Sequence, residues 1–198
     1  GPGNCVASLL NSDSGGHAMK SLRIAITAGL LVCVAAFAQG RIDSESHPMA
    51  GATLADSQGR AVGQAWLRQA PHGVLFTLEL KNATPGIHAL HMHDVGRCDP
   101  PTFESAGAHF NPARREHGFL NPSGAHAGDL PNIAVPNSTD QTLEFFLTGV
   151  TIEPGPQSLM DTNGTAIVIH AGRDDYSSDP AGESGDRLAC GVVARSDR

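Results

Sequence analysis

The chain has 198 residues, and its 20 acidic and 13 basic side chains give a formal net charge of −7. It contains no run of Lys and Arg that could neutralise phosphates, which argues against nucleic acid or an anionic membrane surface as a partner. Hydrophobic residues make up 40% of the chain but aromatic residues only 5%, so a core must be built from Val, Leu, Ile and Ala. The length, less a removable N-terminus, corresponds to one domain.

The N-terminal residues have the pattern of a secretory signal. A positively charged start at residues 19–23 precedes an apolar run at residues 24–38, which is short for a membrane span and ends in Ala-Phe-Ala. A buried helix, or a lipid-modified Cys33, fits the flanking residues less well. We therefore predict an upstream extension, a signal peptide cleaved after Ala38, and one domain, over residues 1–18, 19–38 and 39–198. This organisation predicts a secreted, periplasmic protein with no stable membrane association after cleavage.

Beyond the signal, apolar and polar residues alternate with the period of a β-strand. In residues 73–81 the apolar side chains share one face, and Thr77, Glu79 and Lys81 lie on the other. Similar segments, separated by turns rich in Gly, Pro, Asn and Ser, are expected at residues 49–56, 61–69, 86–94, 132–135, 141–149, 164–170 and 190–194. Eight short antiparallel strands with little helix signal predict an all-β fold, either a β-sandwich or a flattened barrel.

Two segments, residues 94–130 and 171–189, show neither pattern and are rich in Gly, Pro, Asp and Ser. A structureless loop of more than about 15 residues in a compact domain is usually functional, and it needs a disulfide or a metal ion to hold it. Cys98 and Cys190 in an exported chain favour one disulfide, which the chain-entropy model values at about 4–5 kcal/mol. Two unrelated buried thiols are the alternative.

Histidines are concentrated near these loops. His91 and His93 are two positions apart on a predicted strand, so both rings point to the same face and could share one metal ion. His88 faces the other way, and we expect a structural, hydrogen-bonded histidine there. His170 ends another apolar strand where a loop begins. Taken alone, each of these is more often an ordinary strand histidine than a ligand.

The first loop adds three imidazoles and one carboxylate, from His109, His117, His126 and Asp129. Such a set is typical of a four-coordinate zinc site, and imidazole also suits copper. Because six histidines fall into two plausible ligand sets, the sequence favours metal binding over unrelated surface histidines.

Five motifs follow one another in order: HMHDVG, CDPPTFESAGAHFNP, HGFLNPSGAHAGDLPN, VIHAGRDDY and GDRLACGV. They resemble the motifs of the copper/zinc superoxide dismutases, particularly the secreted bacterial ones, over about residues 48–195. The resemblance implies an eight-stranded antiparallel Greek-key flattened barrel with two long functional loops. It also implies copper and zinc as cofactors, superoxide as substrate, and dioxygen and hydrogen peroxide as products.

By position, the resemblance gives each site residue a role. The implied copper ligands are His91, His93, His109 and His170. The implied zinc ligands are His109, His117, His126 and Asp129, so that His109 bridges the two ions and carries a proton to the departing peroxide. The implied neighbours of the site are Asp174, which links His91 to His117, and Arg187, which attracts the anionic substrate. Cys98 and Cys190 match the disulfide that pins the long loop to the last strand.

The second loop departs from the animal enzymes because it has no lysine to draw superoxide in. We expect Asp175, Asp179 and Glu183 to be ordinary solvated loop residues, as we do the pair Arg114-Arg115. The main alternative is a non-enzymatic metal-binding or copper-chaperone-like module, and another is a copper-only dismutase. Both fit less well because all the ligands of both sets are present. The sequence is compatible with a monomer or a homodimer.

Overall fold

The computed structural model of the chain describes residues 49–137 and 140–196. The predicted upstream extension and signal peptide lie outside these residues, as does the start of the predicted domain. No helix in the described part of the chain is long and apolar enough to cross a membrane.

The described residues form strands joined by turns and loops, with one short 3₁₀ helix. The strands are β1 (Met49–Asp56), β2 (Ala61–Ala70), β3 (Gly73–Lys81), β4 (Gly86–His88), β5 (Leu90–His93), β6 (Ile133–Val135), β7 (Asp140–Leu147), β8 (Ala166–His170), β9 (Arg187–Val192) and β10 (Ala194–Ser196). The 3₁₀ helix, η1, covers Glu104–Ala106. The prediction of an all-β antiparallel fold with two long loops is confirmed.

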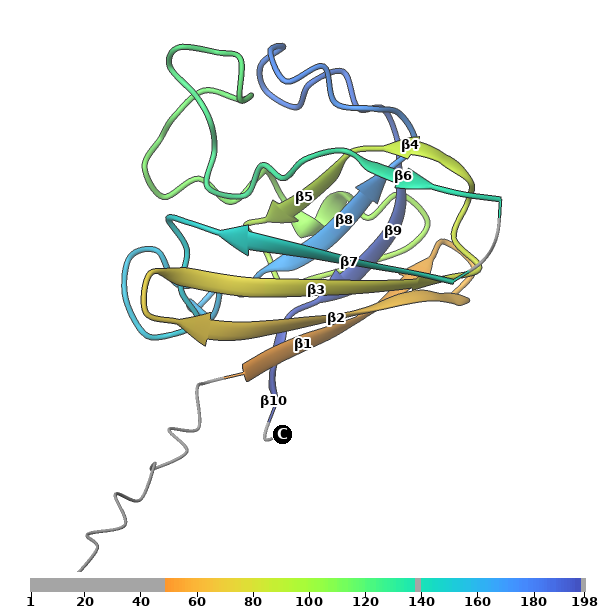
Figure 1. The fold of residues 1–198 in the computed structure, drawn as a ribbon, viewed down its shortest axis with the longest axis horizontal. Helices are drawn as coiled ribbons and strands as arrows, with labels where there is room; N and C mark the ends of the chain where they lie inside the picture. Colours follow the sequence, from red (N-terminus) through yellow and green to blue (C-terminus); the bar gives the residue numbers. More distant parts are fainter. Residues whose placement is uncertain (1–48, 138–139, 197–198) are drawn as a thin grey trace, which may run out of the picture. The chain divides into compact units, whose positions relative to one another are not determined.

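One curled antiparallel sheet contains most of the strands, in the order β5-β8-β9-β1-β2-β3-β7 (Figure 1). β10 pairs with β1, and β4 pairs with β6 in a small second sheet. The strands nearest the chain's described ends therefore lie side by side, because β1 contacts both β9 and β10. The long connections are left at the end of the sheet that carries β5 and β8 (Figure 1).

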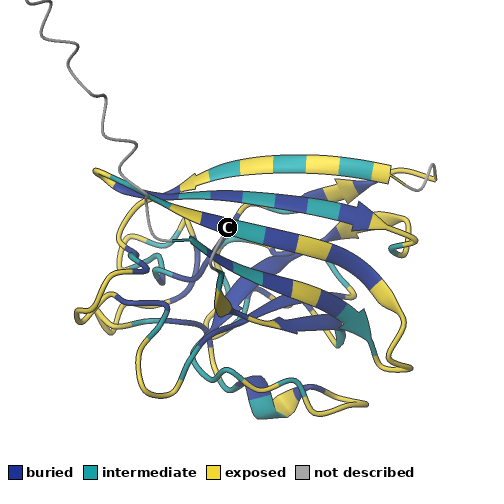
Figure 2. Cartoon of the chain, turned by 90° about the horizontal axis from the view of Figure 1, so that it is seen from below, coloured by how far each residue is buried: buried dark blue, intermediate teal, exposed yellow. Residues whose placement is uncertain are grey.

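Alternation along the strands builds the core, as Figure 2 shows by its changing colours. In β3, Val74, Phe76, Leu78 and Leu80 are buried, while the residues between them are partly exposed. They pack in one cluster with buried side chains from β1, β2, β5 and β8. Strands with this pattern form a curled sheet because one face must leave water.

The segment predicted as a single strand at residues 86–94 is two strands in two sheets, so that part of the prediction was wrong. Ala89 separates them: its N–H donates to Gly172 O and its carbonyl accepts from His170 N. At Ala89 these two bonds, to residues at and just after the end of β8, interrupt the strand pairing. As a result β4 pairs with β6 and β5 pairs with β8. The last predicted strand, residues 190–194, is also divided, since β9 runs over Arg187–Val192 and β10 begins at Ala194.

Candidate metal centre

The long loop, residues 94–132, returns along β5 and brings its ligands beside the strand. Met92 on β5 donates its N–H to Gly128 O and accepts from Phe110 N, both at 2.8 Å. Single bridges pair His93 with His109 and His91 with Asp129. A side chain at Gly128 would collide with the backbone of Met92, so this close approach requires glycine.

A first donor group is formed by histidines that are all buried. One ligand atom from each lies within 4.8 Å of the others, and the members are His91, His93, His109 and His170. His93 Nδ1 donates to Gly107 O at 3.0 Å, and His170 Nδ1 lies 3.2 Å from Gly185 O. Their Nε2 atoms are therefore left facing each other at 3.4 Å. Two nitrogens bound to one tetrahedral ion would be about 3.3 Å apart, given metal–nitrogen bonds of about 2.0 Å.

A second donor group contains three imidazoles and one carboxylate, namely His109, His117, His126 and Asp129. The Nδ1 atoms of the three histidines lie 2.9, 3.1 and 3.2 Å from Asp129 Oδ1. The Nδ1 atoms of His109 and His126 are 3.3 Å apart. The other oxygen, Asp129 Oδ2, accepts from the N–H groups of Gly118 and His126 and so fixes the carboxylate. These spacings again suit one tetrahedral ion.

Three buried ring nitrogens in these groups make no well-aligned hydrogen bond: His91 Nδ1, His109 Nε2 and His117 Nδ1, the last of which lies 3.1 Å from Asp129 Oδ1. A buried polar atom without a partner costs free energy, so a native site with several of them needs an explanation. Two of these nitrogens, His91 Nδ1 and His109 Nε2, are candidate ligand atoms of the first group, and His117 Nδ1 is one of the second group. All three would be satisfied by ions held in the two groups, so the residues fit a pair of bound metals.

Asp174, on the second loop (residues 171–186), joins the two groups and is fully buried. Its Oδ2 accepts from His91 Nε2 at 2.9 Å and its Oδ1 from His117 Nε2 at 3.0 Å. Asn132 clamps the backbone of Asp174, donating to its carbonyl and accepting from its N–H. Such carboxylates fix the orientation and tautomer of a metal-binding ring. The geometry predicted for Asp174 is present, whereas Asn132 was not anticipated.

Three histidines of the first group, His93, His109 and His170, are kept neutral. Burial, together with the neighbouring rings, lowers the pKa of His93 to about 2 and of His170 to about 3. Burial also lowers the pKa of His109 to about 4, although its hydrogen bond with Asp129 opposes this. A neutral ring is the form that binds metal ions, so the protein environment prepares these side chains for coordination.

In the second group the surroundings favour charged side chains: a protonated His117 and ionised carboxylates. Burial disfavours charge on His117, but its contacts with Asp129 and Asp174 prevail and raise its pKa to about 9. Burial also opposes ionisation of the two carboxyls, yet hydrogen bonds from histidines hold the pKa of Asp129 and of Asp174 well below the usual range. The carboxylates stay ionised and the region attracts a cation, a proton or a metal ion.

Arg187 lies at the start of β9 and is fixed to the long loop. Its guanidinium donates to Phe103 O at 2.7 Å and to Gly107 O at 2.8 Å. The Gly107 carbonyl also accepts from His93, so it connects Arg187 with a ligand of the first group. Gly107 has φ +78°, and a side chain there would collide with Asp94. Sequence reasoning had given Gly107 no role.

Cys98 and Cys190 form a disulfide, as predicted, and it fastens the start of the long loop to β9. Behind it, Phe103 and Ala106 pack against Val168 in a second small cluster. The expected structural role of His88 is also confirmed, because it is buried and its ring nitrogens lie 2.8 Å from His170 O and 3.0 Å from Thr84 O.

One of the residues expected to be an ordinary solvated loop residue also contacts the site. Asp179 is exposed, as predicted, with a side chain that is 51% exposed. Its Oδ1 nevertheless accepts from the N–H of His117 at 2.6 Å, a contact that was not predicted. Its loop neighbour Asp175 is exposed too, but its side chain bonds only to Ser177 and Ser178 of its own turn. The sequence gives no sign of this difference, because both are acidic residues in one irregular loop.

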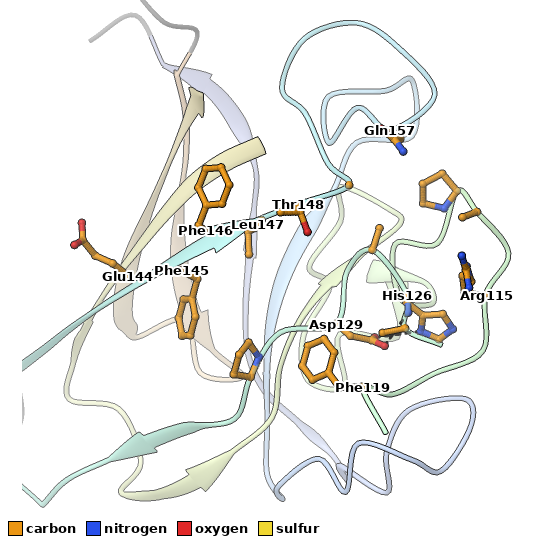
Figure 3. A pocket seen from close by; sticks show the side chains of 16 residues that line it. Arg115, Phe119, His126, Asp129, Glu144, Phe145, Phe146, Leu147, Thr148 and Gln157 are labelled. Atoms are coloured by element: carbon orange, nitrogen blue, oxygen red, sulfur yellow. Dashed lines mark hydrogen bonds and ion pairs between the residues drawn. The ribbon is translucent and has the colours of Figure 1, made fainter. Parts of the chain in front are cut away.

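A pocket of about 670 Å³ opens between the long loop and β7 (Figure 3). Phe119, Phe145 and Phe146 line it, and His126 and Asp129 reach its wall. His126 is the most exposed histidine of the two donor groups, at 9%. The second donor group therefore comes nearest to solvent at His126.

The fold and its site define a class: a β-barrel-like metalloprotein with two adjoining donor groups that share one histidine. Comparison with known proteins gives the family. The family model for copper/zinc superoxide dismutase matches residues 61–193. Superoxide dismutase (Cu-Zn) 2 of Aquifex aeolicus is 43% identical over 177 residues, which cover 88% of this chain and 99% of that protein. The chain belongs to the copper/zinc superoxide dismutase family.

Solved structures agree with this assignment. A superoxide dismutase-like protein from Bacillus subtilis has a TM-score of 0.69 and 34% identity, covering 72% of this chain and 96% of its own. Copper/zinc superoxide dismutase from Brucella abortus has a TM-score of 0.58 and 26% identity, covering 74% of this chain and 99% of its own.

Proposed function

We propose that the protein catalyses the dismutation of superoxide, converting two superoxide anions and two protons to one dioxygen and one hydrogen peroxide. The observation that carries this proposal is the pair of complete donor groups joined by His109. A bound copper ion supplies the one-electron redox chemistry, whereas zinc does not change its oxidation state.

The two donor sets suit different ions. Copper is proposed for the all-imidazole first group, namely His91, His93, His109 and His170. Zinc is proposed for the second group, His109, His117, His126 and Asp129, because three imidazoles and a carboxylate suit a closed structural zinc site. Its lone carboxylate, Asp129, is buried and held by backbone N–H groups, which makes this group rigid.

His109 and Arg187 are the residues we propose to act on the reacting species. His109 has one ring nitrogen in each group, and its Nε2 has no other partner, so it can hold a proton there and give it to the leaving peroxide. Arg187 is anchored through two carbonyl oxygens and keeps its positive charge near the first group. A fixed guanidinium attracts a small anion more effectively than a mobile one because its orientation is already set.

Two further parts of the proposal concern the cell and the assembly. Relatives in Aquifex aeolicus and Caulobacter vibrioides are bacterial, and export through residues 19–38 to the periplasm would suit the disulfide. We also propose a homodimer, which would cover the neighbouring apolar side chains of Phe119 and Leu120, now 48% and 72% exposed. N-terminal sequencing of the exported protein and sedimentation velocity test these two points.

The activity is tested by metal analysis and a superoxide assay on the same sample. We expect about one copper and one zinc per chain, in line with the two four-ligand groups, and rapid loss of superoxide. Changing His91→Ala should abolish dismutation while zinc stays bound. His72→Ala, at an exposed turn, is the matched control and should behave as the wild type. Zinc at every site, or activity that survives His91→Ala, would contradict the proposal.

A further inference from the structure

The outer ring nitrogens of the donor histidines are almost all paired. His93 and His170 use Nδ1 to reach backbone carbonyls, and His91 and His117 use Nε2 to reach Asp174. His126 differs: within residues 49–137 and 140–196 no hydrogen bond reaches its Nε2. Asp179 Oδ1 lies 4.0 Å from that atom.

The same oxygen of Asp179 contacts a second member of the group. It accepts from the N–H of His117 at 2.6 Å, so one carboxylate faces both His117 and His126. No sequence-adjacent constraint forces this, since Asp179 and His117 are 62 positions apart. Two contacts to one donor group make chance proximity of a surface acid a poor explanation.

The turn that carries Asp179 is itself fixed against the site. Gly182 donates to Ser178 O at 2.6 Å and accepts from Asp175 N at 3.0 Å. Gly182 has φ +66°, and a side chain there would collide with Asp174 and come within 2.7 Å of His117 Nε2. The second loop therefore lies directly on the second donor group, and Asp179 is held where it can act on it.

We propose that Asp179 is a positioning residue of the zinc group: it holds the backbone of His117 by a hydrogen bond, and its charge lies 4.0 Å from the outer nitrogen of His126. A carboxylate opposite the outer N–H of a ligating imidazole orients the ring and makes the ligating nitrogen more basic. Here Asp179 also holds the backbone of His117, so the second loop and the zinc ligands become one unit. The inference rests on the proposed function, because it assumes that zinc is the ion of this group.

Two substitutions separate the roles of Asp179 in the full, copper-loaded protein. Asp179→Asn keeps an oxygen that can accept from His117 N–H but removes the negative charge opposite His126. Asp179→Ala removes both. Asp175→Asn, in the same exposed loop, is the matched control because the side chain of Asp175 bonds only to Ser177 and Ser178. Zinc affinity is measured by competition with a chelator, and cobalt(II) in place of zinc reports the ligand field by its visible absorption.

We expect Asp179→Asn to lower zinc affinity about tenfold and to shift the cobalt absorption bands, with Asp179→Ala at least as severe and the control unchanged. Copper content should stay that of the wild type. If Asp179→Asn binds zinc as the wild type does, with the same cobalt spectrum, the inference is overturned, even if Asp179→Ala is weak. A wild-type protein that takes up no zinc would instead refute the proposed function as well.

Discussion

The strands β1 to β3 and the two long loops are stabilised by different kinds of interaction. The strands pair over seven residues between β1 and β2 and eight between β2 and β3, and they bury Leu54, Leu67 and Phe76 completely. The loops bury few large apolar groups, and they are held by the disulfide, by Arg187, and by carboxylates that bond to histidines and to backbone N–H groups. Apolar burial is additive and non-directional, whereas the loop contacts fail together when one charged partner is lost.

This contrast separates stability from function within one small domain. The barrel supplies β5 and β8, which pair with each other and carry three of the proposed metal ligands. The loops supply the remaining ligands and should be the less protected region when metals are absent, because little apolar surface holds them. Mutations in the barrel should therefore change mainly the stability of the fold, and mutations in the loops mainly the binding of metal ions.

The disulfide should give the largest effect, because it is the covalent link between the two regions. Replacing Cys98 and Cys190 by Ser should lower the free energy of unfolding by about 4–5 kcal/mol, given a separation of 92 residues. Urea titration of the metal-free protein measures this. Reduced wild-type protein should match the variant, and a variant as stable as the oxidised wild type would mean that the loop is held by its other contacts.

A core substitution tests the barrel alone. Phe76→Ala leaves a cavity where a fully buried ring packs, and should cost about 3–5 kcal/mol of unfolding free energy. Below its unfolding transition the variant should still bind both metals in the wild-type ratio. Phe146→Ala, at a side chain that is 53% exposed, is the control and should change little. Loss of metal from folded Phe76→Ala would show that the two regions are not separable.

The barrel was the more predictable region because its signal is local. Alternation alone located β1 and β3 at the same residues that the structure shows. The two-residue spacing of His91 and His93 predicted that both rings lie on one face of the strand. His88 is an odd number of residues from both, which predicted the opposite face and a structural role. What alternation could not reveal is the break at Ala89, since that depends on hydrogen bonds to Gly172 and His170, far along the chain.

The loop contacts were less predictable because they join residues that the sequence does not relate. The resemblance to a family supplied the ligand sets and Asp174. It did not supply Asn132, which clamps Asp174, or Gly107, whose carbonyl serves both His93 and Arg187. Backbone carbonyls and amides have no signature in a sequence, so their role appears only when the chain is folded.

A substitution in the loops should have the opposite effect to Phe76→Ala: it should lower metal affinity and leave the strands folded. Asp174→Asn keeps the size of the side chain but weakens its bonds to His91 and His117. Metal affinity should fall about 10–100-fold, or about 1.4–2.7 kcal/mol, while the strands stay folded. Chelator competition measures it for both ions, with Asp175→Asn as the control. An unchanged affinity for both would show that Asp174 has no effect on the ligands.

The smallest effect is a pH dependence that belongs to the loops alone. His117 has a folded pKa raised to about 9, against about 6.5 when unfolded. A raised pKa stabilises the fold fully below pH 6.5, and that contribution is lost as the pH rises towards 9. His93, His109 and His170 have lowered pKa values in the fold. Their unfolded rings are largely neutral only above about pH 7.5, so they contribute little above that pH.

The metal-free protein should therefore lose up to about 1.4 kcal/mol of unfolding free energy for each pH unit between about pH 7.5 and pH 8.5. Urea titrations at several pH values measure the slope. His117→Asn removes the titrating ring, so its stability should be flat over this range. Zinc takes the place of the proton on His117, so the zinc-loaded wild type should be flat as well. A metal-free protein whose stability rises with pH would show that Asp129 and Asp174 do not retain a proton on His117, and that the loop carboxylates are held by other partners.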